Sequence, residues 1–238
     1  MRFFCMHRHD PHTEAGEPPP PELIGKMGAF IGEHAARGEF LDGAGLGKSA
    51  TRTRLAFRGG EGTVEKMAFH GHDELPSVIL KLTVKDREQG LDWARRYGKL
   101  LGDCELELSP VNEPWDLGLM PRPENAPLHL LLIEKGEPAT RTPKQKADLT
   151  RLKKEMAGAG VLEGEITLAH SARAKRLVFR DHQLTLHDGP FSESKELVGG
   201  FALMELASMD AALAMAKRYA EILGGTLEMD IRPVDEEA

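Results

Sequence analysis

The segment Ala94-Arg95-Arg96-Tyr97 recurs further along the chain as Ala216-Lys217-Arg218-Tyr219. A second pair of matching segments, Leu55–Arg58 and Leu177–Arg180, has the same separation of roughly 122 residues. Similarity of a sequence to itself at one long, fixed separation indicates a duplicated structural unit. The chain is therefore predicted to hold two copies of one small unit.

A proline-rich segment lies between the two copies. Residues 113–125 contain three prolines and show no helical or strand periodicity, which is typical of a semi-stiff linker. We therefore predict a first copy at residues 1–112 and a second at 126–238.

Each copy has the same predicted order of strands and helices. The predicted elements, first copy then second, are a strand (2–7; 128–134), a helix opened by Pro21 or Pro143, a hairpin strand (54–58; 176–180) with its return strand, a further strand (78–84; 201–207), a helix capped by Asp86 or Ser208, and a last strand (104–108; 226–231). This is a ferredoxin-like α+β order with an extra hairpin strand. Because such a unit has helices on only one face of its sheet, we expect the two units to pair sheet to sheet as an intrachain dimeric α+β barrel.

Composition excludes some classes of function. The net charge of −7 argues against a nucleic-acid-binding surface, which needs an excess of basic residues. Apolar runs are too short for a membrane span or a signal-peptide core, so we expect a cytoplasmic protein that does not bind membranes. The two cysteines, Cys5 and Cys104, do not make a disulfide framework.

The second copy carries the motif Asp188-Gly189-Pro190-Phe191 and closes with Ile231-Arg232-Pro233-Val234. In these features it resembles the DGPF (YCII-related) family, and the resemblance covers nearly all of the second copy. The repeat aligns Lys66-Met67-Ala68-Phe69 with the motif, so only the phenylalanine survives in the first copy. The resemblance therefore predicts one intact site and one decayed site.

The resemblance implies two classes of function. Family members look like dimeric α+β barrels, and the wider superfamily includes lyases and isomerases that act on small organic acids. One expectation is thus a small-molecule lyase or isomerase-like enzyme with a cleft near the motif. The alternative is a non-catalytic ligand-binding or regulatory module, because some relatives are associated with extracytoplasmic-function sigma factors. No cofactor is implied, and the chain is expected to be a monomeric pseudo-dimer or a dimer of tandems.

Three residues are candidate catalytic groups: Asp188, His170 and His187. A carboxylate at a strand end can act as a general base or acid, and histidine titrates near neutral pH. Neighbouring strand residues point to opposite faces, so His187 and Asp188 cannot form a dyad with each other, and His170 is the better partner. The structural alternatives are an Asp-Gly turn and a solvated loop histidine.

Four residues are candidate ligand contacts: Phe191, Glu193, Lys195 and Phe201. The phenylalanines would wall the pocket and the charged pair would bind polar groups. Their structural alternatives are core packing for the phenylalanines and a solvated polar loop for the charged pair.

Two histidine-rich segments suggest a third alternative, metal-dependent chemistry. They contain His7, His9 and His12, and His70 and His72. Such residues suit a divalent metal, but exposed loops rich in histidine more often bind metal adventitiously. We therefore predict no metal site.

Overall fold

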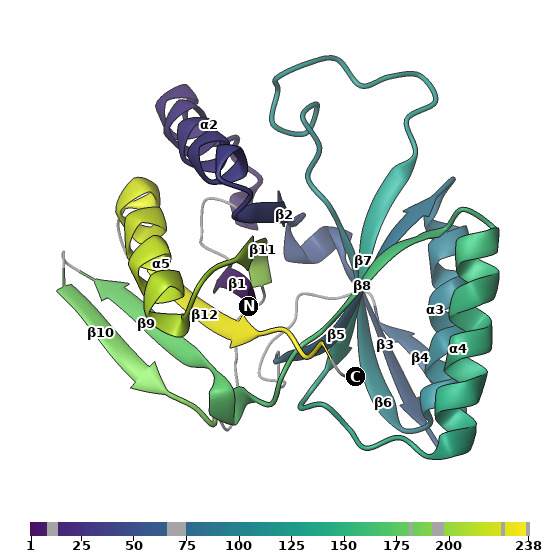
Figure 1. Ribbon diagram of the computed structural model, residues 1–238. Helices are drawn as coiled ribbons and strands as arrows, with labels where there is room; N and C mark the ends of the chain where they lie inside the picture. Colours follow the sequence, from purple (N-terminus) through teal and green to yellow (C-terminus); the bar gives the residue numbers. More distant parts are fainter. Residues whose placement is uncertain (9–13, 66–74, 181–182, 192–197, 225–226, 237–238) are drawn as a thin grey trace.

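The computed structural model describes residues 1–8, 14–65, 75–180, 183–191, 198–224 and 227–236 (Figure 1). These residues form an α+β structure. Its helices are α2 (Pro21–Ala36), α3 (Arg87–Leu101), α4 (Pro143–Gly158) and α5 (Met209–Leu223), with 3₁₀ turns η1 (Ser49–Thr51) and η2 (Ser171–Arg173). Its strands are β1 (Arg2–Arg8), β2 (Phe40–Gly45), β3 (Thr53–Arg58), β4 (Glu61–Glu65), β5 (Pro76–Val84), β6 (Cys104–Pro110), β7 (Leu128–Lys135), β8 (Leu162–Thr167), β9 (Lys175–Arg180), β10 (Gln183–Asp188), β11 (Val198–Glu205) and β12 (Leu227–Pro233).

The strands form two antiparallel six-stranded sheets that exchange strands between the halves of the chain. The first sheet has the order β10-β9-β12-β1-β11-β2 and the second has the order β4-β3-β6-β7-β5-β8. Strands β1 and β2 thus lie in a sheet whose other four strands come from the second half. Strands β7 and β8 complete the sheet of the first half in the same way. The two orders are the same when each strand is replaced by its counterpart about 122 residues away.

The exchange corrects our expectation that each half would build a sheet of its own. Strand β1 pairs with β11 and β12, and β7 pairs with β5 and β6. The local ferredoxin-like order is kept, with the first strand in the centre of each sheet. Hydrogen bonding along a strand does not distinguish a partner from the same half from its counterpart in the other half, so the sequence pattern fits both arrangements.

Three apolar cores hold these layers together. One lies between the second sheet and helices α3 and α4, and another lies between the first sheet and helices α2 and α5 (Figure 1). The third joins the two sheets face to face. Its buried members are Phe4, Met6, Leu46, Ile79, Leu131, Ile133, Ile166, Leu168, Val198 and Phe201. Each fully buried side chain of this size contributes about 1.5–3 kcal/mol.

Several predicted details are confirmed. Asp86 and Ser208 cap α3 and α5 by accepting from backbone N–H groups, and Pro21 and Pro143 open α2 and α4. Each cap satisfies a helix-end N–H that has no intrahelical partner. No helix in the described part of the chain is both long and apolar enough to cross a membrane.

Strands β2 and β8 were not predicted. The sequence of β2, Phe40-Leu41-Asp42-Gly43-Ala44-Gly45, has low strand propensity because of its glycines and aspartate. It pairs at the edge of the first sheet with β11, and Gly43 lies against the Phe201 carbonyl, where a Cβ would come within 2.8 Å. Tertiary pairing therefore outweighs local propensity in this segment.

Candidate functional site

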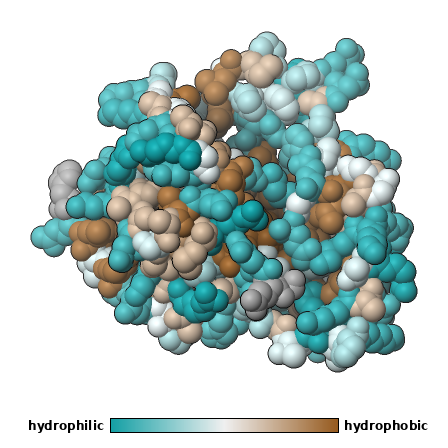
Figure 2. Space-filling view, viewed as in Figure 1, coloured by the Kyte–Doolittle hydropathy of each residue, from teal (hydrophilic) through white to brown (hydrophobic). Residues whose placement is uncertain are grey.

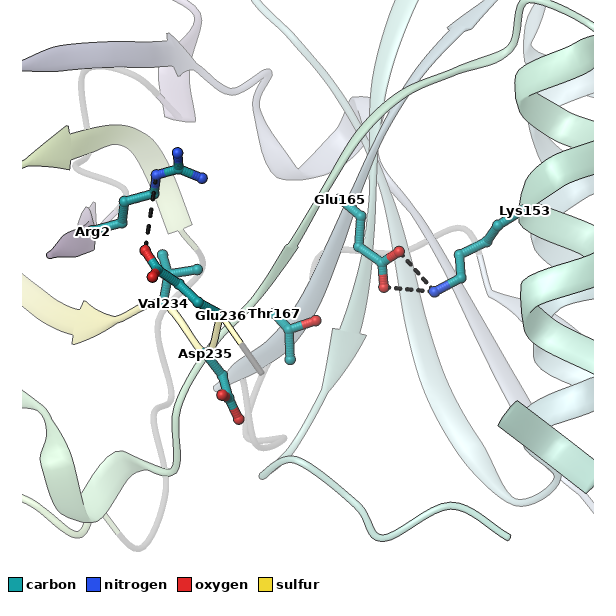
Figure 3. Close-up of a pocket in the computed structure, with 7 residues that line it drawn as sticks. All are labelled: Arg2, Lys153, Glu165, Thr167, Val234, Asp235 and Glu236. Carbon is teal, nitrogen blue, oxygen red and sulfur yellow. Dashed lines mark hydrogen bonds and ion pairs between the residues drawn. The ribbon is translucent and has the colours of Figure 1, made fainter. Parts of the chain in front are cut away.

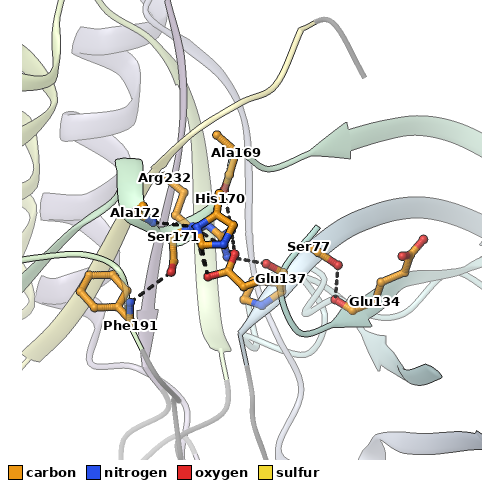
Figure 4. A network of polar contacts seen from close by, with 10 residues as sticks. Ser77, Glu134, Glu137, Ala169, His170, Ser171, Ala172, Phe191 and Arg232 are labelled. Atoms are coloured by element: carbon orange, nitrogen blue, oxygen red, sulfur yellow. Dashed lines mark hydrogen bonds and ion pairs between the residues drawn. The ribbon is translucent and has the colours of Figure 1, made fainter. Parts of the chain in front are cut away.

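The candidate site is a rim where the turn after β10 packs on η2 (Figure 4). The N–H of Gly189 donates to the carbonyl of Ala174 at 3.1 Å, and the N–H of Phe191 donates to the Ser171 hydroxyl at 3.1 Å. These two bonds join the predicted motif to the segment that follows His170. We call residues 170–174 together with 188–191 the η2 rim.

Glycine is required in this turn. A Cβ at Gly189 would come 1.8 Å from the Ser171 carbonyl oxygen, a distance that no side chain can adopt without moving the backbone. The glycine of the motif therefore reflects a close approach of two backbones. Any larger residue here would push the Asp188 turn away from η2.

A polar network that includes the buried Arg232 and the half-buried Glu137 supports the rim (Figure 4). The N–H of Ser171 donates to both carboxylate oxygens of Glu137, at 3.0 and 3.2 Å. The fully buried guanidinium of Arg232 donates to Glu137 at 3.2 Å and to the Pro76 carbonyl at 2.6 Å. It also donates to the carbonyl of Ala169. Burial lowers the pKa of Arg232, and the carboxylates of Glu137 and Asp230 oppose that shift.

His170 caps η2 with its side chain. Its Nδ1 accepts from the N–H of Ala172 at 3.2 Å and lies 3.8 Å from a Glu137 oxygen. In the neutral ring this arrangement leaves the proton on Nε2. Because the side chain is 56% exposed, the ring offers an N–H donor to solvent.

Asp188 ends β10 and pairs across the hairpin with Lys175, whose ammonium donates to its carboxylate. The carboxylate side chain is 72% exposed. His187 lies opposite Arg176 in the same hairpin, so His187 and Asp188 point to opposite faces of the sheet. No direct hydrogen bond joins His170 to Asp188 among the contacts of the described residues; the two are neighbours through the backbone contacts of Gly189 and Ser171.

The Phe191 ring contacts Arg176, which belongs to a group of paired charges on the inter-sheet face. The Arg176 guanidinium lies 4.2 Å from the Phe191 ring centroid, within cation–π range. Arg176 donates to the buried Asp230 at 2.6 and 3.0 Å, and Arg8 donates to the same carboxylate. We call this group, Arg8, Arg176 and Asp230, the β12 charge cluster.

The other half of the chain builds a counterpart around η1. The N–H of Ser49 donates to Glu14 at 3.0 Å, as that of Ser171 does to Glu137. Arg52 donates to the carbonyls of Gly47 and Val198 at 2.7 and 2.8 Å. We call residues 48–52 the η1 rim.

The η1 rim also rests on a buried charge cluster. Arg52 donates to Glu107 at 2.9 Å, and Lys135 lies 2.5 Å from the other oxygen of that carboxylate. Burial raises the pKa of Glu107, but Lys135 and Arg52 outweigh it and hold the pKa at about 2. We call these three residues the β6 charge cluster.

The two rims use arginines from different positions. Arg52 follows η1, and the residue that follows η2 is Ala174. Arg232 precedes the proline that closes β12, and the residue before the proline that closes β6 is Ser109. Two non-equivalent arginines therefore place a guanidinium at equivalent points of the fold, each held by two backbone carbonyls.

The structure brings only some predicted site residues to the η2 rim. Asp188, His170 and Phe191 lie there, whereas Phe201 lies in the inter-sheet core with its ring 4.9 Å from that of Phe4. Glu193 and Lys195 fall outside the described residues, as do His9, His12, His70 and His72. The described part of the chain holds no group of three or more residues suited to a metal, and His7 contacts the Tyr219 hydroxyl at 3.0 Å.

Sequence reasoning missed the supporting residues Ser171, Glu137, Arg232, Lys175 and Arg176. One signal was available for them. Polar residues alternate with apolar ones in β12, as in Met229-Asp230-Ile231-Arg232, which indicates that every second side chain lies on one face. That face packs against the other sheet, and the alternation alone did not indicate that its charged residues form buried ion pairs.

An open pocket of about 450 Å³ lies elsewhere, between the C-terminal segment and α4 (Figure 3). Its lining residues are Arg2, Lys153, Glu165, Thr167, Val234, Asp235 and Glu236. Lys153 pairs with Glu165 at 2.7 Å, and Arg2 lies 4.0 Å from Glu236, so the charges of the wall largely satisfy one another. The pocket shares no residue with the η2 rim.

The structure is that of an α+β protein with two ferredoxin-like sheets and a polar rim at a strand-end turn. Comparisons with known proteins identify its family. The family model of the YCII-related domain matches residues 132–235. An uncharacterised protein of Rhizobium meliloti (strain 1021), R00369, is 31% identical over 87 residues, which cover 37% of this chain and 70% of that protein. No solved structure matches the chain. The chain belongs to the YCII-related family.

Proposed function

We propose that the η2 rim binds a small organic acid and transfers a proton on it, as a lyase or isomerase-like enzyme would. The observation that carries the proposal is the contact of Gly189 with Ser171, because it joins the His170 segment to the Asp188 turn. The buried network of Glu137 and Arg232 supports one arrangement of the rim. Rigid support of this kind is what proton transfer to a bound molecule requires.

Two groups of the rim, and Lys175 beside it, have roles in this proposal. The Lys175 ammonium binds the carboxylate of the ligand, in exchange for its pairing with Asp188. The Nε2–H of His170 donates to a ligand oxygen, since Nδ1 already accepts from Ala172. Asp188 is then the base that takes the proton.

We further propose that residues 1–112 are a diverged copy of the family domain at 126–238, joined by the linker at 113–125. The identical strand order of the two sheets and the shared inter-sheet core support an intrachain dimeric α+β barrel. In this account the second copy carries the intact site and the η1 rim serves as scaffold. Lys48, at the position equivalent to His170, provides a matched control.

A thermal-shift screen of small organic acids tests binding at the η2 rim. A ligand at a hundredfold excess over its Kd stabilises the folded chain by about 2.7 kcal/mol. Such a gain raises the Tm of a chain of this size by about 5–10 °C. We expect Asp188→Asn and His170→Gln to lose the shift while keeping the Tm of the unliganded protein, and Lys48→Gln to keep both. A ligand that stabilises all four proteins equally would place binding elsewhere.

The second candidate function is ligand binding or regulation without turnover. In the regulatory form, the partner would be an extracytoplasmic-function sigma factor. The pairing and exposure of Asp188 favour it, because a solvated carboxylate that already has a lysine partner suits binding as well as catalysis. This module would give the same thermal shifts with no chemical change in the ligand.

A further inference from the structure

Strand β10 is an open sheet edge with an apolar face. It pairs only with β9 among the described strands, and all six of its residues are exposed. In Figure 1 it forms the outer border of the first sheet, and Figure 2 shows apolar side chains at that border. The apolar residues are Leu184 and Leu186, which are 41% and 45% exposed. An edge of this kind presents unpaired N–H and C=O groups to another strand.

We propose that two copies of the chain pair through β10 in antiparallel register, with the twofold axis at Thr185. The backbone groups of successive residues point alternately towards β9 and away from it, so two identical edges can bond only when the axis passes through a residue position. With Thr185 facing its own counterpart, Leu184 faces the partner's Leu186. Gln183 then faces the partner's His187.

The β10 sequence is self-complementary in this register. Gln183-Leu184-Thr185-Leu186-His187 reads polar, apolar, polar, apolar, polar in both directions. Four leucines meet on one face, because Leu184 faces the partner's Leu186 and Leu186 faces the partner's Leu184. Their cross-strand neighbours within the chain are Phe179 and Leu177, so the new cluster continues the core beneath α5. Cross-strand apolar pairs are the main stabilising contacts of sheets.

The equivalent edge of the other sheet is protected against such pairing. Strand β4 has the sequence Glu61-Gly62-Thr63-Val64-Glu65, and Thr63 is the counterpart of Thr185. Pairing about Thr63 would set Glu61 against the partner's Glu65 twice. Like charges directly opposite each other destabilise a sheet, and a glycine would take the place of one leucine. The two edges therefore differ in the feature that decides self-association.

A single pair of six-residue strands buries less area than a stable interface of about 1,200 Å² or more. We therefore expect a reversible dimer that forms at protein concentrations on the order of tens to hundreds of micromolar. The dimer contacts lie at residues 183–187, outside the η2 rim, so the inference is independent of the proposed function.

Site-directed crosslinking tests the register. Thr185→Cys places two thiols opposite each other at the axis, within the Cα separation of about 4.4–6.8 Å that a disulfide needs. We expect mild oxidation to yield a covalent dimer of Thr185→Cys, and at least tenfold less with His187→Cys or Thr63→Cys. Equal yields at positions 185 and 63 would overturn the proposal. A higher yield at 187 than at 185 would overturn the register.

Sedimentation tests the surface without new cysteines. Leu186→Glu is expected to weaken dimerisation at least tenfold, whereas Val64→Glu, at the equivalent position of β4, leaves it unchanged. Both residues are exposed, so neither change should lower the Tm appreciably. A wild-type chain that stays monomeric at several hundred micromolar would overturn the proposal, as would a dimer that survives Leu186→Glu.

Discussion

The η1 and η2 rims are two versions of the same construction. In both, the N–H of a buried serine that opens a 3₁₀ turn donates to a glutamate, and a buried guanidinium is held by two backbone carbonyls. They differ in the residues that face solvent: Lys48 stands where the other rim has His170. The comparison indicates that the fold requires the same buried scaffold in both halves, whereas the exposed groups differ.

Both rims contain the same buried guanidinium site, although the arginine comes from a different position in each. Arg52 and Arg232 occupy non-equivalent positions, yet each donates to a carbonyl just before its 3₁₀ turn and to the carbonyl of the first residue of β11 or β5. A buried guanidinium is costly unless all its donors are paired. The fold thus specifies where the guanidinium lies. The arginine can come from the residue after the 3₁₀ turn or from the last strand.

The largest effect is expected from breaking these arginine sites. Arg232→Ser and Arg52→Ala should each destabilise the chain by about 3–5 kcal/mol, because each leaves two buried carbonyls without the guanidinium donor and removes one partner of a carboxylate. Adding Ala174→Arg to Arg232→Ser converts the η2 rim to the η1 arrangement and should restore at least half of the loss. Urea denaturation of the two single variants and the double variant measures this coupling.

The rescue has a clear control. Ala174→Arg alone should destabilise the chain, because Ala174 is buried and Arg232 already fills the space. If the double variant is less stable than either single variant, the two arginines do not serve the same point of the fold.

Acid should weaken the β6 charge cluster. Despite burial, which raises it, Lys135 and Arg52 hold the pKa of Glu107 at about 2 in the folded chain, below the ordinary glutamate value of 4.5, so its contribution to stability is complete above pH 4.5 and is lost as the pH falls to about 2. The difference corresponds to about 3 kcal/mol. Glu107→Gln should lower stability at pH 7 and flatten the dependence of the urea midpoint between pH 5 and 2. An unchanged slope in the variant would mean that other carboxylates cause the acid sensitivity.

Two equivalent tyrosines should give smaller, unequal effects. Tyr97 donates to Glu134, which Arg141 also holds with two bonds of 2.7 Å, whereas Tyr219 contacts His7 at 3.0 Å. Burial raises the pKa of both hydroxyls. Tyr97→Phe should cost about 2 kcal/mol because its acceptor is charged, and Tyr219→Phe about 1 kcal/mol. Equal losses of unfolding free energy in the two variants would show that the charge of Glu134 does not strengthen its hydrogen bond with Tyr97.

The smallest effect concerns the two cysteines. Burial raises the pKa of Cys5 and of Cys104 to about 12, so at pH 8 both thiols are far less ionised than a free cysteine. A thiol reagent should label both slowly in the native chain and rapidly in urea. Cys104 should react first because it is less buried. Fast labelling of Cys5 would indicate that β1 leaves its sheet.

Much of the fold could be predicted from the sequence because local signals were strong. Helix caps such as Asp86 and Ser208, and the prolines that open α2 and α4, are signals set by neighbouring residues. Strand exchange could not be predicted, since the residue pattern of a strand does not encode which half of the chain supplies its partner strand. The buried charges were missed for a related reason: alternation in β6 and β12 indicates two faces, but not which charged residues of the inter-sheet face pair with one another.

The site was predictable only where a motif marked it. Asp188 and Phe191 lie in the motif, and His170 was selected as the best partner on the barrel rim. Glu137 and Arg232 act through contacts between segments about 95 residues apart, which no local pattern encodes. Phe201 was expected to line a pocket because it is a large aromatic near the motif, yet alternation along β11 turns it into the inter-sheet core.

The most direct test of the account is hydrogen exchange on a bound ligand. An acid that binds at the η2 rim is incubated in D₂O with the wild-type chain, Asp188→Asn and Lys48→Gln, and NMR follows loss of the proton next to its carboxylate. The account predicts exchange catalysed by the wild type and by Lys48→Gln, and a rate at least a hundredfold lower with Asp188→Asn. Binding without exchange in the wild type would contradict proton transfer and leave the rim as a binding module. Equal exchange with Asp188→Asn would show that the base lies elsewhere.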